Sequence, residues 1–239
     1  MIAWRRSPAL LAGACVLLVA AACGDKSGSV QGRAPAGPAP DSFRVAFETS
    51  RGTFVVEAIR GWAPNGADRF YALALEGFFD DDRFFRVVPG FIAQFGINTE
   101  KQVNERWDDA KLPDDPPRQS NARGTLVFSS DGPNSRSHQM FVNLADNKRL
   151  DGQGFVPFGR VVSGMEVVDS IYGGYGEAPV QQLIQTLGNS YLARMFPKLD
   201  YIKSAKILDL AAPGTPTGRV GRGPARSLRL VPHVIGKGV

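Results

Sequence analysis

The sequence predicts a mainly β protein whose short strands close into an antiparallel barrel. Many short apolar and aromatic runs occur in the central part of the chain, most of them bounded by Gly, Pro, Asn or Ser. Few segments have the apolar spacing of a helix, and there are no internal repeats. A chain of 239 residues that is 43% hydrophobic can also bury a sizeable core. This combination is typical of a closed antiparallel barrel.

The first strands and helix are predicted from two different apolar periods. Alternating Phe43, Val45 and Phe47 and then Phe54 and Val56, with a turn at 50–52, predict a strand pair. Residues 63–79 instead carry an apolar stripe at helical spacing, with Pro64 near the start and Gly77 at the end.

Residues 84–95, within RFFRVVPGFIAQFG, predict two short strands joined at Pro89-Gly90. The polar stretch 98–123 follows, with three prolines and two pairs of aspartates. Its acidic residues lack the spacing of a calcium loop, so we expect a solvated loop.

The remaining elements alternate between strand and helix patterns. We expect a helix at 164–172, and a longer helical segment at 179–196 that Gly188 interrupts. The predicted strands lie at 124–130, 138–144, 155–162 and 199–210.

The N-terminus predicts export. A cationic start precedes an apolar run, Pro8 to Ala22, that is shorter than the about 20 residues needed to span a bilayer. We therefore expect a signal peptide at 1–22. The small residues before Cys23 resemble a bacterial lipobox, so Cys23 is expected to be lipidated and to anchor the protein to a membrane of the cell envelope. An ordinary cleavage site with an incidental Cys23 is the alternative. After either cleavage one cysteine at most remains, so no internal disulfide is expected.

The composition divides the rest of the chain into three parts. Residues 23–42 are rich in Pro, Gly and Ala and predict a flexible tether. The folded domain is expected at 43–210, and 211–239 is expected to be a disordered basic tail. The net charge of +5 is concentrated at the two ends, which leaves the body slightly acidic and argues against a nucleic-acid partner.

The chain contains the blocks FFRVVPGFIAQFG, GPNSRSHQMFVNL and RLDGQGFVPFGRVVSGMEVVD. They resemble three motifs of cyclophilin-type peptidyl-prolyl cis-trans isomerases and occur in the same order as in that family. The likeness covers about Phe43 to Leu210. It implies an eight-stranded barrel capped by two helices, with the active groove on its outer wall. The segment before the last strand is similar to a subset of secreted bacterial members that carry an extra helix there.

The resemblance also implies the site. It assigns catalysis to Arg86, Phe91, Gln94 and Phe141, with no cofactor and no metal. Gln94 is expected to bond substrate backbone and steady Arg86, and Ser130 to pair with the peptide through its backbone. The predicted substrate-binding residues are Ile92, Ser130, Gln139 and Leu150, together with His138 and Phe155, which stand where the chain departs from the family pattern.

The chemistry explains why such a site needs a fixed cation. Rotation of an Xaa-Pro bond breaks amide resonance, with a barrier of about 20 kcal/mol, and leaves the proline nitrogen basic. A donor aimed at that nitrogen favours the twisted state over both planar states. Arginine is suitable because it stays charged and presents rigid donors.

Some positions depart from the family pattern. Phe85 replaces a common histidine, and Arg149 stands where many members have a tryptophan, which puts cyclosporin-type inhibitor binding in question. His138 replaces a small residue, and we expect it to influence selection of the residue before the Xaa-Pro pair. Ser137 and His138 also suggest a hydrolase, but no nucleophile elbow or acid partner is recognisable.

We expect a monomeric isomerase that acts on proline-containing segments of exported proteins. A catalytically weak scaffold or chaperone of the envelope that only binds such segments is the alternative. A structural adaptor built on the same barrel is a third possibility.

Overall fold

The computed structural model describes residues 37–208. The predicted signal peptide, Cys23, most of the tether and the basic tail lie outside these residues. Within them, no helix is both long enough and apolar enough to cross a bilayer.

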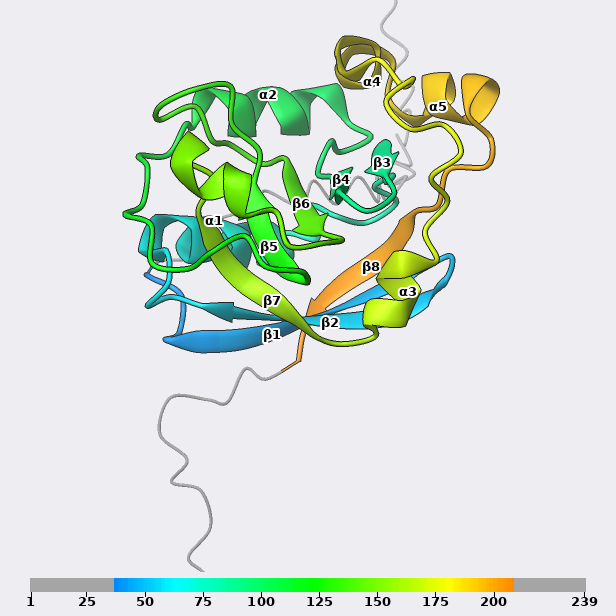
Figure 1. The fold of residues 1–239 in the computed structure, drawn as a ribbon. Helices are drawn as coiled ribbons and strands as arrows, with labels where there is room; N and C mark the ends of the chain where they lie inside the picture. Colours follow the sequence, from blue (N-terminus) through cyan, green and yellow to red (C-terminus); the bar gives the residue numbers. More distant parts are fainter. Residues whose placement is uncertain (1–36, 209–239) are drawn as a thin grey trace, which may run out of the picture. The chain divides into compact units, whose positions relative to one another are not determined.

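A curved eight-stranded sheet forms the body of the described part, with helices at its ends and rim (Figure 1). The strands and helices, in chain order, are β1 Ser42–Thr49, β2 Gly52–Ile59, α1 Pro64–Leu75, β3 Arg86–Val88, β4 Ile92–Phe95, α2 Lys101–Asp109, β5 Thr125–Phe128, β6 Met140–Asn143, the 3-10 helix Lys148–Gln153, β7 Pro157–Ser163, α3 Met165–Asp169, α4 Gln181–Leu187, α5 Asn189–Met195 and β8 Ile202–Ile207.

All neighbouring strands pair antiparallel, in the order β3-β4-β6-β5-β7-β2-β1-β8. The predicted fold class is therefore confirmed, but the word "closed" overstates it. The edge strands β3 and β8 do not form a ladder with each other. The residues just before them meet through an isolated bridge, Arg83 to Tyr201, and the N–H of Phe84 donates to the Asp200 carbonyl at 3.0 Å.

The alternation in β1 and β2 buries one face of this strand pair. Phe43, Val45 and Phe47 are buried, and Phe47 lies opposite Phe54 with the two rings stacked at 4.9 Å. Cross-strand aromatic pairs of this kind stabilise a sheet beyond their burial. The predicted turn and strand pair are confirmed.

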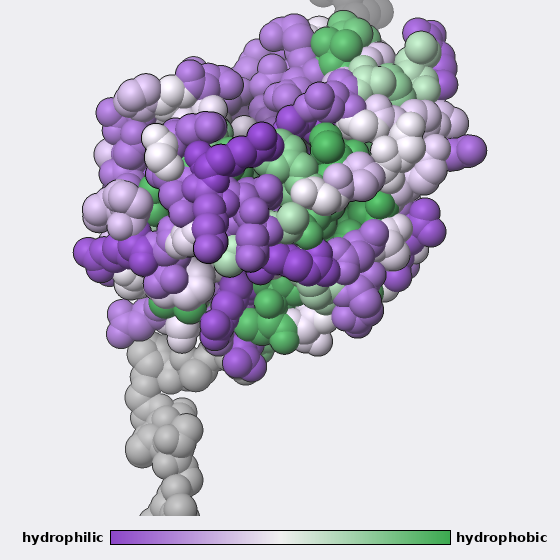
Figure 2. Space-filling view, viewed as in Figure 1, coloured by the Kyte–Doolittle hydropathy of each residue, from purple (hydrophilic) through white to green (hydrophobic). Residues whose placement is uncertain are grey.

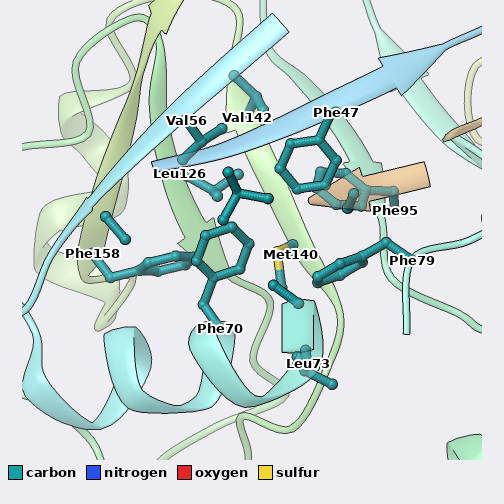
Figure 3. Close-up of a cluster of buried hydrophobic side chains, with 14 of the residues drawn as sticks. Phe47, Val56, Phe70, Leu73, Phe79, Phe95, Leu126, Met140, Val142 and Phe158 are labelled. Carbon is teal, nitrogen blue, oxygen red and sulfur yellow. The ribbon is translucent and has the colours of Figure 1, made fainter. Parts of the chain in front are cut away.

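Phenylalanine rings fill the interior between the sheet and α1 (Figure 3). Phe70 of α1 packs against Phe47, Phe79 and Phe158, with ring centroids 5.2–6.1 Å apart. Burying each ring removes apolar area from water and stabilises the fold by roughly 1.5–3 kcal/mol. The predicted apolar stripe of this helix is therefore what holds α1 on the sheet.

The stretch 98–123 differs from the predicted solvated loop, because it contains α2 and several buried polar groups. Asp115 is buried and accepts the backbone N–H groups of Asn65 and Gly66, each at 2.9 Å. It also pairs with Arg136, whose side chain is only 1% exposed, at 3.1 Å. Asp115 thus caps the first turn of α1, where backbone donors have no partner inside the helix. The sequence offered no periodic signal for this contact between distant segments.

The segment before β8 forms two short helices where the resemblance implied one. Gly188 ends α4 and begins α5 with φ at 58°, and a side chain there would meet the Thr99 carbonyl oxygen at 2.5 Å. Ile184 and Leu192 of these helices pack with Phe85 and Ile97, which explains an aromatic residue at position 85. Green side chains gather over α4 in Figure 2, where Leu183 and Leu187 are exposed.

Replacing Asp115 should strongly destabilise the fold. Asp115→Ala removes the buried carboxylate that pairs with Arg136 and uncaps α1, and it leaves Arg136 with only the more exposed Asp114 as an acid partner, at 3.3 Å. We therefore expect a loss of about 2–4 kcal/mol in the free energy of unfolding. Urea denaturation followed by circular dichroism measures this. Asp109→Ala is the matched control, because Asp109 is exposed, and should change stability by less than about 0.5 kcal/mol. Equal stabilities for the two variants would contradict this account.

Candidate active site

The site starts from a cross-strand pair on the outer side of the sheet. Arg86 in β3 lies opposite Gln94 in β4, and its Nη1 donates to Gln94 Oε1 at 3.2 Å. Gln94 is buried, and its Nε2 donates to Gln139 Oε1 at 3.1 Å. The Arg86 side chain is 25% exposed. Its guanidinium is therefore oriented by the buried amide of Gln94, which is oriented in turn by its hydrogen bond to Gln139.

An apolar slot adjoins this pair. Phe141 of β6 is the neighbour of Gln94 across the ladder, and its ring meets the ring of Phe155 edge-on at 5.8 Å. The slot has a volume of about 190 Å³, and Arg86 and Gln94 line one side of it. The other lining residues are Phe91, Ile92, Ser129, Phe141, Leu150, Gln153 and Phe155.

Phe91 is fixed in the slot through its backbone. Its carbonyl oxygen accepts the N–H of Leu144 and the Nδ2 of Asn147, each at 2.8 Å. Asn147 is buried and also donates to Asn143 Oδ1 at 2.7 Å. Arg149, the residue at the expected tryptophan position, lies over the Phe91 ring at 4.5 Å. An inhibitor entering this edge of the slot meets a cation stacked on Phe91.

A second, polar cavity of about 230 Å³ lies on the other side of Arg86 and Gln94. Ser130 and Gln139, both predicted to bind substrate, line it. Within residues 37–208 the backbone N–H and C=O of Ser130 have no hydrogen-bond partner, as a peptide-pairing position requires. The sequence did not predict the other polar lining residues, which include Asp108, Lys111, Ser135, Ser137, Gln181 and Gln185.

His138 lines neither cavity, although the sequence predicted that it would contact substrate. The side chain is fully buried, and Nδ1 lies 2.6 Å from the Gly96 carbonyl oxygen. A carbonyl only accepts, so Nδ1 carries a proton. Nε2 lies 3.1 Å from Asp108 Oδ1, and this contact with His138 lowers the pKa of Asp108 below its usual range. His138 therefore fastens the end of α2 to the end of β4.

These contacts also exclude the arrangement that a serine hydrolase needs. Ser137 Oγ donates to Asp108 Oδ1 at 3.0 Å, so the hydroxyl faces the acid and the imidazole does not act as its base. Among residues 37–208 no group of three or more His, Cys, Asp and Glu side chains is arranged to hold a metal ion.

Together the slot and the polar cavity define a peptide-binding β-barrel with a fixed arginine between two subsites. A family model described as cyclophilin-type peptidyl-prolyl cis-trans isomerase matches residues 44–187. The chain therefore belongs to the cyclophilin family, and it is a peptidyl-prolyl cis-trans isomerase.

Curated relatives agree with this assignment. Peptidyl-prolyl cis-trans isomerase-like 1 of Aspergillus niger is 35% identical over 130 residues, which span 52% of this chain and 78% of the relative. Peptidyl-prolyl cis-trans isomerase B of Escherichia coli is 32% identical over 146 residues, which span 54% and 84%.

Solved structures support the fold. A crystal structure of a cyclophilin-type isomerase from Cryptosporidium parvum is 20% identical, with a TM-score of 0.54, and the match covers 70% of this chain and 98% of that one. A second structure of the same protein, in the presence of the dipeptide Ala-Pro, has a TM-score of 0.52 and 19% identity, with 70% and 99% covered.

The lowered pKa of Asp108 predicts how acid affects α2. A folded-state pKa below the unfolded value, about 3.9, stabilises the protein above that pH, and the stabilisation is lost as pH falls through the folded value. We expect Asp108→Asn to be less stable than wild type at pH 6, with a difference that shrinks below about pH 4. Thermal melting of both proteins from pH 6 to pH 2.5 measures this. A stability difference between the two proteins that stays constant with pH would show that the charge of Asp108 does not stabilise the fold.

Proposed function

We propose that Arg86 performs the isomerisation by donating to the proline nitrogen of the twisted amide while the apolar slot holds the proline ring. The observation that carries this proposal is that Arg86 lines the slot together with Phe91, Phe141 and Leu150. A proline seated against these side chains has its nitrogen near the guanidinium. The nucleophile, base and metal of a bond-breaking enzyme have no part in this mechanism.

The size of the rate enhancement requires both the Arg86 donor and the apolar slot. Raising the rate from roughly 10⁻² to 10³ per second lowers the barrier by about 7 kcal/mol. One preorganised donor supplies roughly 3–4 kcal/mol. The remainder must come from holding the ring while the preceding carbonyl turns, and from excluding water from the amide. The hydrogen-bonded backbone of Phe91 suits the task of holding the proline ring, and the buried Gln94 suits the task of excluding water.

We propose proline-containing, flexible segments as the substrates. The slot is apolar and lies beside a polar cavity that can receive the preceding chain, with the backbone of Ser130 available to pair with it. The related Cryptosporidium parvum protein was solved in the presence of Ala-Pro, which is consistent with this substrate class.

We further propose that these substrates are exported proteins and that the enzyme is a monomer anchored to the cell envelope. The apolar run before Cys23, the small residues that precede this cysteine and the Pro/Gly/Ala-rich stretch up to residue 42 support the anchor.

Removing the cation should abolish most of the activity. We expect Arg86→Ala to lower kcat/KM on a short Xaa-Pro peptide by about 10²–10³-fold, since one preorganised donor is lost. A protease-coupled assay or NMR exchange spectroscopy measures this on residues 37–208.

Arg160→Ala is the control, because Arg160 is exposed on β7 and pairs with Glu57 at 3.2 Å outside both cavities. Wild-type turnover by Arg86→Ala would reject the mechanism. Peptide binding by the wild type without measurable turnover would favour the binding scaffold.

The lipid anchor is tested at Cys23. In a bacterial host, the wild-type chain should incorporate labelled palmitate and sediment with membranes, whereas Cys23→Ser should be unlabelled and recovered mostly in the soluble envelope fraction, because a lipid chain binds through about 0.8 kcal/mol for each buried CH₂. Cys15→Ser is the control and should behave as wild type. Labelling that persists in Cys23→Ser would rule out this attachment site.

A further inference from the structure

Arg86 has a second polar partner, from a segment that follows α3. Oε1 of Glu177 accepts a hydrogen bond from Arg86 Nε at 2.6 Å, and Nη2 of the same guanidinium forms an ion pair with that oxygen. We propose that Glu177 is a positioning residue for isomerisation, which holds the Arg86 guanidinium by its Nε edge. This inference rests on the catalytic role proposed for Arg86.

The backbone before Glu177 is attached to β3 itself. The N–H of Val87 donates to the Gly176 carbonyl oxygen at 3.2 Å, so the chain on either side of the ion pair is joined directly. Gly173 lies close against β3 as well, since a side chain there would come within 3.1 Å of Pro89. The ring of Tyr175 packs edge-on against Phe196 of the segment after α5. Glu177 therefore extends from a supported loop that covers the edge strand.

The remaining donors of Arg86 fit the proposed mechanism. A guanidinium has five N–H groups. Glu177 accepts a hydrogen bond from Nε and forms an ion pair with Nη2, and Gln94 accepts a hydrogen bond from Nη1. At least two N–H groups remain for substrate, on a group that is held from two directions. An arginine side chain loses much conformational entropy when it is ordered. If it is already ordered before substrate binds, the reaction does not bear this entropic cost.

The ion pair is too exposed to be mainly a device for stability. The Glu177 side chain is 63% exposed, and surface pairs contribute little to folding. Loss of Glu177 should thus leave the fold intact and act through Arg86. The opposite role is a carboxylate that masks the cation and slows turnover, and it predicts a change in the other direction.

The test compares four variants of the full-length protein on a short Xaa-Pro peptide: two substitutions of Glu177, Arg86→Ala and the double variant. We expect Glu177→Ala to lower kcat/KM about three- to tenfold, mainly through kcat, because the guanidinium is less well oriented. Glu177→Gln should lose less than about twofold, since its amide oxygen still accepts from Nε. In Arg86→Ala, adding Glu177→Ala should cause no further loss, as two residues that act through one group are not additive.

Two further readouts separate positioning from a general structural effect. The Nε–H signal of Arg86 in ¹H–¹⁵N NMR should be protected from exchange in the wild type and in Glu177→Gln, and lost in Glu177→Ala. Glu166→Ala is the matched control, because Glu166 is an acid of α3 in the same region with no ion pair among the described residues. It should leave turnover and the Arg86 signal unchanged.

The outcomes distinguish the two proposals. If Arg86→Ala is inactive while Glu177→Ala keeps wild-type turnover and an unchanged Nε–H signal, the role of Glu177 is rejected and that of Arg86 stands. Faster turnover in Glu177→Ala also rejects positioning, in favour of masking. If Arg86→Ala retains turnover, both proposals fall together.

Discussion

The hydrogen bond between Arg86 and Gln94 is the interaction on which the rest of the site depends. It joins two facing residues of β3 and β4, so the sheet register itself sets the position of the guanidinium. Gln94 in turn lies opposite Phe141, which places an aromatic wall next to the cation. A polar pair and an apolar slot are thus adjacent because three strands are in register, and a shift of one residue would turn all of these side chains to the other face.

Buried polar contacts hold the irregular segments around this pair. Asp115 with Arg136 attaches the stretch after α2 to α1, and His138 with Asp108 attaches α2 to the end of β4. Asn147 fixes the carbonyl of Phe91. Such contacts are expensive to leave incomplete, because a buried donor or charge without a partner loses its hydration. Of these residues, Asp108 lines the polar cavity and Phe91 lines the slot.

The segment after β7 adds a wall that the core barrel lacks. Its loop places Glu177 on Arg86, and α4 contributes Gln181 and Gln185 to the polar cavity. The exposed Leu183 and Leu187 lie on the same short helix. The lining of the polar cavity is therefore shared between the strands, the loops that join them and the helical segment before β8.

Local sequence patterns were enough to predict the strands, α1, the apolar face of β1 and, through the motif around Arg86, the family and most residues of the slot. These features follow from local periods and from residue types that recur at fixed spacing. Four other features appear only in the folded chain: the barrel stays partly open, the acidic stretch buries Asp115, His138 is buried between α2 and the end of β4, and Glu177 contacts Arg86. Each of these features depends on contacts between segments far apart in the chain. One hydrogen bond or ion pair needs only one residue in each segment, so it produces no periodic pattern in the sequence.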